Sequence, residues 1–110
     1  MTLRIPDEHV QHAFDILKSQ KHAAARAAYE FADKHLKVIL AKAQLAANGK
    51  TVGERDAAAL ASPEYERALI DFRLVAENYH GERDRRDAAS AVIDAWRTLR
   101  SDERAMGKVG

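Results

Sequence analysis

Residues 49–67 read GKTVGERDAAALASPEYER and decide the fold, because they hold the stop and start signals between two long helical patterns. Asn48 and Gly49 are typical of a helix end with a left-handed C-cap. Thr51 and Glu54 have the spacing of a capping box, which predicts that a short helix starts there. The stretch therefore predicts a helix end, a turn and a new helix.

A second helix start follows once this short helix has ended at Ala61. Ser62 is a typical N-cap residue, and Pro63 suits the first helical position. From there, apolar residues recur at spacings of three and four, at Tyr65, Ala68, Leu69, Phe72, Val75, Ala76 and Tyr79. After a charged segment the pattern resumes with Ala88, Ala89, Val92, Ile93, Trp96 and Leu99. We expect one long helix, bent or frayed near Gly81, with two separate helices as the alternative.

Residues 21–48 form the other long helical pattern, and it is apolar on two sides. The inner row consists of Tyr29, Ala32, Leu36, Ile39, Leu40, Ala43 and Ala47. The outer row consists of Phe31, Val38 and Leu45, which are spaced by seven. At 100° per residue, Val38 lies about 200° from Leu36. A helix with two apolar sides needs two partners, so we expect the outer row to be the interface of a homodimer or larger bundle.

The chain starts with a weaker helical signal and ends without an apolar pattern. Pro6 at a first helical position, followed by Asp7 and Glu8, suits a helix N-terminus. Val10, Ala13, Phe14 and Leu17 supply its short apolar stripe. We expect a flexible tail over residues 105–110.

The composition favours long, thin helices. The chain has 110 residues, which is the length of one domain, here predicted over residues 1–104. It contains 22 alanines but only seven aromatic residues, and alanine favours helix while burying little area. We therefore predict an all-α fold, an antiparallel hairpin of two long helices with short accessory helices and coiled-coil-like spacing.

Charge and cysteine content indicate the cellular compartment and the class of partner to expect. The net charge is +1, so the chain as a whole does not attract nucleic acid or membranes electrostatically. From Lys18 to Lys50, however, the sequence contains seven Lys and Arg residues and only two acids, Glu30 and Asp33. The chain has no cysteine, its first residues are unlike a signal peptide, and no apolar run approaches a membrane span. We expect a cytoplasmic protein that does not contact membranes.

From Gly49 to the C-terminus, several short motifs resemble a family of small helical bacteriophage proteins. The matching residues are Lys50-Thr51, Glu54-Arg55, Ser62-Pro63-Glu64-Tyr65, Arg85-Arg86, Ala95-Trp96-Arg97 and Arg104-Ala105. The resemblance implies a phage or prophage origin, in a host cytoplasm, often beside replication and recombination genes and without an enzymatic role. The motifs themselves are signals for helix starts and ends, and they contain no catalytic residues.

Two groups of basic residues are candidates for contacting phosphates or an acidic partner. Lys34, Lys37 and Lys42 lie on one helix side, where they can follow a phosphate backbone. Arg97 and Arg100 follow Trp96 in the late helix, and single-strand binders pair aromatic residues with cations in this way. The alternatives are a solvated lysine face and a Trp96 that belongs to the core.

Metal and catalytic patterns are weak. Glu77 and His80 have the spacing of two ligands on one helix face, as in ferritin-like hairpin subunits, but they point away from the apolar stripe. His9 and His12 form a second pair that lacks a third ligand. No Ser–His–Asp arrangement can be argued. We predict no metal, no cofactor and no enzymatic activity.

These observations lead to one leading function and two alternatives. The leading interpretation is a phage-encoded accessory protein for DNA recombination or replication, which binds single-stranded DNA or a protein that handles it. The first alternative is a protein-only adaptor or inhibitor of host machinery that uses the outer row. The second is the metal-binding, ferritin-like hairpin subunit.

Overall fold

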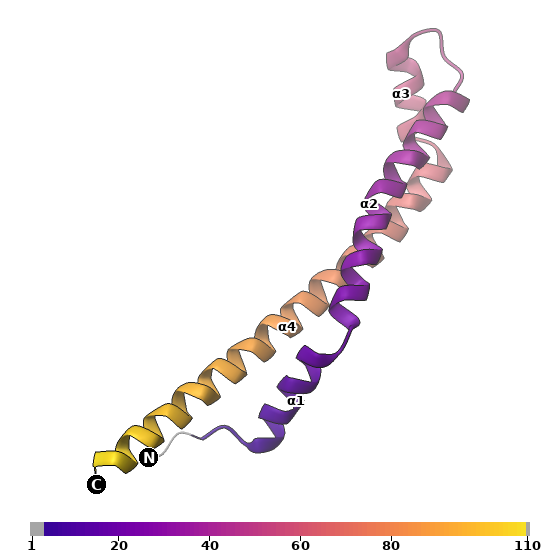
Figure 1. Cartoon of the computed structure of the whole chain (residues 1–110). Helices are drawn as coiled ribbons and strands as arrows, with labels where there is room; N and C mark the ends of the chain where they lie inside the picture. Colours follow the sequence, from indigo (N-terminus) through magenta and orange to yellow (C-terminus); the bar gives the residue numbers. More distant parts are fainter. Residues whose placement is uncertain (1–3, 110) are drawn as a thin grey trace. The chain divides into compact units, whose positions relative to one another are not determined.

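A computed structural model describes residues 4–109, which form four α-helices and no strand (Figure 1). The helices are α1 (Asp7–Lys18), α2 (Lys21–Ala46), α3 (Val52–Leu60) and α4 (Pro63–Val109). The predicted all-α class is confirmed. The described residues form two compact units, residues 23–80 and residues 4–22 with 81–109, and α4 contributes to both.

The predicted capping box opens α3. The side chain of Thr51 accepts a hydrogen bond from the backbone N–H of Glu54 at 3.1 Å. In return, the Glu54 carboxylate accepts from the backbone N–H of Lys50 at 2.8 Å, one residue earlier than in the usual box. Two N–H groups at this helix start thus have partners that the sequence pattern supplies.

Gly49 does not play the role that the sequence suggested. The helix α2 ends at Ala46, and no glycine within residues 4–109 has a positive φ angle, so the predicted left-handed C-cap is wrong. Gly49 instead lies close to the first turn of α3. A Cβ atom on it would stand 3.0 Å from the Cβ of Glu54 and 3.1 Å from the backbone nitrogen of Arg55. The absence of a side chain lets the loop approach the helix.

Ser62 caps α4 as predicted, and Pro63 is the first residue of that helix. The Ser62 hydroxyl accepts a hydrogen bond from the backbone N–H of Tyr65 at 3.3 Å. It also donates to the carbonyl of Ala59 at 2.7 Å, near the end of α3. One side chain therefore stabilises both ends of the short connection.

We expect the substitution Ser62→Ala to lower the free energy of unfolding by about 1 kcal/mol, because it removes the N-cap acceptor. Thermal and chemical denaturation would measure the change. Ser101→Ala is the matched control, since Ser101 is exposed inside α4, where alanine is the better helix former. Equal stability of the two variants would contradict a capping role for Ser62.

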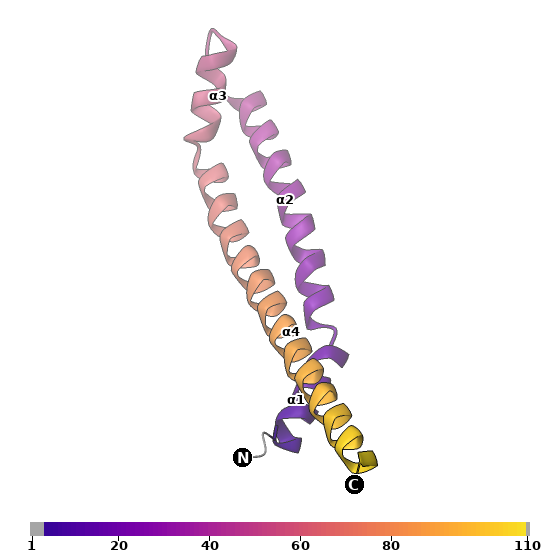
Figure 2. The same cartoon turned by 90° about the vertical axis from the view of Figure 1, so that its left-hand side faces the viewer.

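In the unit of residues 23–80, α2 lies beside the first part of α4 (Figure 2). The ring of Tyr29 on α2 stacks on Tyr79 at 4.8 Å between centroids and contacts Phe72 at 5.6 Å. The amide of Gln44 donates to the carboxylate of Asp56 at 3.1 Å and joins α2 to α3. The inner row is half-buried throughout, as its spacing predicted.

The core of this unit is thin. Within residues 23–80, all of which the structure describes, the only buried residues are two alanines, Ala25 and Ala59. Large apolar side chains remain half-buried or exposed. The unit therefore keeps much apolar surface in contact with water.

The helix α4 is continuous across Gly81 and the charged segment that follows it, which confirms the expected single long helix. A Cβ atom at Gly81 would meet nothing within 4 Å, so close packing does not explain the glycine. The helix also continues through residues 105–109, where we expected a flexible tail. Alanine and methionine there are good helix formers. Gly110 lies outside the described residues.

The other unit packs α1 against the C-terminal part of α4, and its core is more complete. Ala13, Ala89 and Ile93 are each 3% exposed, and Phe14, Ile16 and Val92 pack around them. Trp96 is half-buried and meets Phe14 edge to face at 6.0 Å, in agreement with its interpretation as a core residue.

The ends of α1 differ slightly from the sequence expectation. Pro6 occupies the N-cap position and not the first helical position, and Asp7 begins the helix. At the other end Ser19 has an extended backbone, and its hydroxyl donates to the carbonyl of Ile16 at 3.0 Å. This serine separates α1 from α2.

Candidate binding surface on the helix α2

The outer row of α2 is exposed, and it lies on the side turned away from α4. The exposed fractions are 70% for Phe31, 47% for Val38 and 89% for Leu45. Because the inner row supplies the contacts with α4, a row about 200° around the helix faces solvent. Three large apolar side chains in line form a candidate interaction surface.

Phe31 has an aromatic neighbour within this surface. The rings of Phe31 and His35 stack at 5.6 Å between centroids with only 11° between their planes. The two residues are one helical turn apart, and both are exposed. This stacked pair lies at the N-terminal end of the outer row.

Lysines flank the outer row. Lys34 and Lys42 lie one turn before and one turn after Val38, and both are exposed. Lys37 lies 3.9 Å from the carboxylate of Asp33, with 77% of its side chain exposed. Exposed pairs of this kind contribute little energy, so Lys37 can exchange its partner for a phosphate. The three predicted lysines thus share one solvent-facing side of α2.

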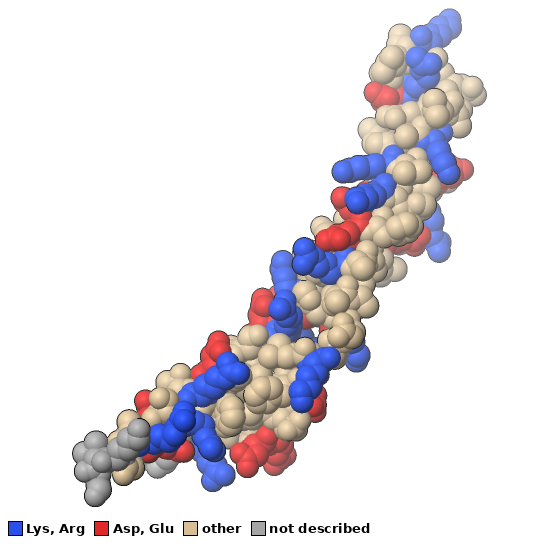
Figure 3. Space-filling view, in the orientation of Figure 1, with Lys and Arg blue, Asp and Glu red and all other residues tan. Residues whose placement is uncertain are grey.

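The acids on α2 limit the charge of this side. Arg26 donates to Glu30 at 3.1 Å, and both side chains are more than half exposed. On the face shown in Figure 3, Lys and Arg side chains alternate with Asp and Glu. Acids therefore offset part of the positive charge on α2.

Arg97 and Arg100 belong to the other unit. Both are exposed, and the guanidinium of Arg100 lies over the Trp96 ring at 5.7 Å from its centroid. Arg100 and Trp96 line a cavity of about 350 Å³ together with Arg4, Ile5, Asp7, Leu99 and Glu103. The acids in that lining offset its cations. The five predicted binding residues are thus divided between two units.

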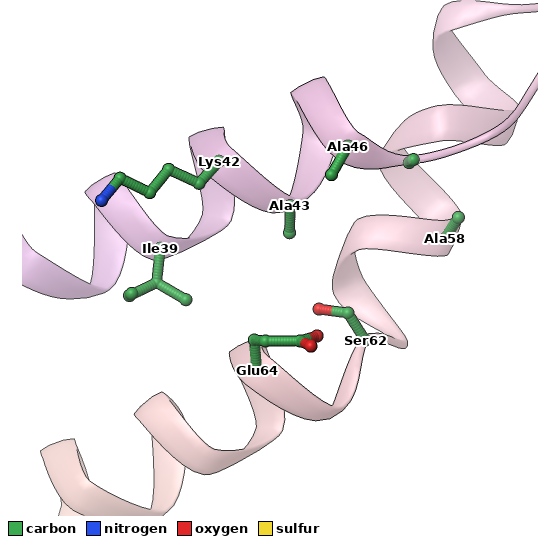
Figure 4. Close-up of a pocket in the computed structure, with 8 residues that line it drawn as sticks. Ile39, Lys42, Ala43, Ala46, Ala58, Ser62 and Glu64 are labelled. Atoms are coloured by element: carbon green, nitrogen blue, oxygen red, sulfur yellow. The ribbon is translucent and has the colours of Figure 1, made fainter.

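A cavity of about 400 Å³ where α2, α3 and α4 meet was not predicted from the sequence (Figure 4). Ile39 and Ala43 point from α2 into the space that Ser62 and Glu64 face. The remaining lining residues are Lys42, Ala46, Ala47 and Ala58. Four of the lining residues are alanines, whose small side chains leave this space open, and these alanines are the sequence feature that could have indicated the cavity. The Ser62 hydroxyl donates to Ala59, so its proton is engaged in helix capping.

The candidate metal ligands do not come together. The Glu77 carboxylate accepts from Arg73 at 3.0 Å, and His80 lies 5.8 Å from the Tyr29 ring. His9 and His12 are exposed on α1. Within residues 4–109, no group of three or more His, Cys, Asp or Glu side chains is placed to hold a metal ion. In the same range, no helix is both long enough and apolar enough to cross a membrane.

Comparisons with protein-family models, with curated proteins and with solved structures found no match. The geometry of α2 is therefore the main basis for a functional proposal.

Proposed function

We propose that this chain is a non-enzymatic accessory protein of DNA recombination or replication, encoded by a phage, that binds single-stranded DNA. One observation carries the proposal: Lys34, Lys37 and Lys42 are exposed on the solvent-facing side of α2, and His35 adds an exposed aromatic ring to this helix. Bases of a single strand stack on aromatic rings, and lysines pair with phosphates. The phage origin rests on the motifs of residues 49–105 alone.

In this proposal α2 and α4 form an antiparallel hairpin, and hairpins associate through the outer row. Association matters for binding because one chain offers few cations. Three lysine–phosphate contacts on a single strand imply a salt slope of only about −2, and two chains together give about −4. Linking two weak sites also raises the effective concentration of the second. The assembly then binds a strand that one chain holds weakly.

Fluorescence anisotropy with a labelled oligothymidine tests the DNA proposal. We expect binding at about 50 mM salt that weakens steeply as salt is raised, without strong sequence preference. Replacing Lys34, Lys37 and Lys42 together by alanine should flatten the salt slope while helicity is kept, because alanine is the better helix former.

The control variant replaces Arg83, Arg86 and Arg104 by alanine, which removes the same charge from exposed positions on α4. It should bind like the wild type. Equal losses in both variants would show that net charge and not the α2 surface governs binding. No binding by the wild type at tens of micromolar protein in low salt would end the DNA proposal.

A second candidate function is a protein-only adaptor or inhibitor of host machinery. The exposed outer row favours it, because Leu45 at 89% and Phe31 at 70% exposure are the kind of apolar anchors that a partner protein buries. Binding to such a partner would tolerate salt, since apolar contacts dominate. Salt-insensitive binding to a protein, without binding to oligothymidine, would favour this function.

A further inference from the structure

The unit of residues 23–80 has a second exposed apolar surface, on α4. Ile70 is 51% exposed and Leu74 is 60% exposed, and they lie one turn apart. Phe72 and Tyr79 form the side of α4 that meets Tyr29 of α2. At 100° per residue, Ile70 and Leu74 point away from that side. We call Ile70 and Leu74 the α4 patch.

The two surfaces carry different charges. Five basic residues and two acids lie on α2, whereas residues 63–80 of α4 carry four acids and two arginines. Close to the outer row stand Lys34 and Lys42, and close to the α4 patch stands Glu66, one turn before Ile70. Arg67 and Arg73 are already paired with Asp71 and Glu77 at 3.5 Å and 3.0 Å. Lys34 and Lys42 thus lie close to the outer row, whereas the segment that carries the α4 patch has two more acids than basic residues.

We propose that the outer row of α2 in one copy packs against the α4 patch of a second copy. A contact of two outer rows would bring lysines of one α2 close to the same lysines of the other, and like charges across an interface disfavour it. The contact between an outer row and an α4 patch brings those lysines to the acids of α4. This proposal deepens the self-association in the proposed function and does not depend on DNA binding.

The contact is heterologous, because each copy uses two different surfaces. After one contact has formed, the first copy still offers its α4 patch and the second still offers its outer row. Such contacts add further copies until a ring closes, or they extend as a chain. The assembly is therefore expected to exceed a dimer.

Multi-angle light scattering of three samples tests this arrangement. The wild type at tens of micromolar should have a mass above twice that of the 12.3 kDa chain, rising with concentration. The variants Val38→Glu and Ile70→Glu should each be monomeric, since each loses one of the two surfaces to a buried charge. An equal mixture of the two variants should form a dimer and grow no further, because one intact surface of each kind remains.

Controls separate assembly from folding. Ser101→Glu adds the same charge outside both surfaces and should assemble like the wild type, and circular dichroism should show equal helicity for all variants. Leu45→Glu repeats the test of the outer row at a position that is 89% exposed, where the single chain tolerates a charge.

Two results would overturn the proposal. The first is a wild-type chain that is monomeric under these conditions. The second is an Ile70→Glu variant that assembles like the wild type while Val38→Glu is monomeric. This pattern indicates contact between two outer rows. Oligothymidine anisotropy reports on DNA binding separately. Assembly without DNA binding would refute only the proposed function, and DNA binding by a monomer would refute only this inference.

Discussion

Replacing Ile93 by alanine is expected to lower the free energy of unfolding of its unit by about 3 kcal/mol, within the range of buried Ile-to-Ala changes. Ile93 is 3% exposed and packs with Ala13 of α1 and Ala89 of α4. Phe14 and Ile16 of α1 pack against the same cluster, so Ile93 is at the centre of the contact that holds α1 in place. The cavity left by the substitution should release α1 before the rest of the chain unfolds.

Amide hydrogen exchange of α1 (Asp7–Lys18) provides the most direct measurement, together with chemical denaturation. Exchange should accelerate in α1 and change little in α2. Leu60→Ala is the control, since it shortens an apolar side chain that is 55% exposed on α3. Equal destabilisation by the two substitutions would show that Ile93 is not the centre of the core.

The substitution Gly49→Val is expected to destabilise the chain by about 1–3 kcal/mol, which is the usual cost of overpacking. The cause is the close approach of the loop to α3, because a Cβ at Gly49 would stand 3.1 Å from the backbone nitrogen of Arg55. A backbone atom at the start of a helix cannot move aside as a flexible side chain does. Thermal melts measure the effect.

The control for this substitution is Gly53→Val, which would place its Cβ 4.0 Å from the hydroxyl of Thr51, an ordinary contact. Gly53→Val should cost less than Gly49→Val, because Gly53 lies within α3 and valine is a better helix former than glycine. A Gly49→Val protein as stable as the wild type would show that the loop can take a path farther from α3.

The sequence predicted the helices well because their signals are local. The capping pair Thr51 and Glu54 and the N-cap Ser62 are recognisable from spacing alone, and the structure shows their hydrogen bonds. The two rows of α2 follow from the periodicity of a helix, and their exposure in the structure matches it.

The features that the sequence did not predict depend on contacts between separate segments. Gly49 was expected to need a positive φ angle, but its role comes from the path of the loop near Glu54 and Arg55. The break at Ser19 has no strong breaker in the sequence, and a single side-chain hydrogen bond to Ile16 accompanies it. Likewise, the alanines that leave the cavity beside Ser62 belong to more than one helix.

The candidate surface was predicted in its parts but not in its arrangement. The spacing placed Phe31, Val38 and Leu45 in line, and lysines nearby, since both are properties of one helix. The stacking of Phe31 on His35 is a choice of side-chain conformation that spacing does not specify. The α4 patch was missed because Ile70 and Leu74 lie within a segment whose inner stripe dominated the pattern.

The continuity of α4 has a consequence for how the chain folds. Starting a helix is slow and unfavourable, because several residues must be ordered before the first hydrogen bond forms, whereas extending an existing helix adds one bond per residue. Residues 63–80 and 81–109 are parts of one helix but belong to different units. Once either part is ordered, the turn next to residue 80 or 81 serves as the nucleus for the other part. The two units therefore share one nucleation event.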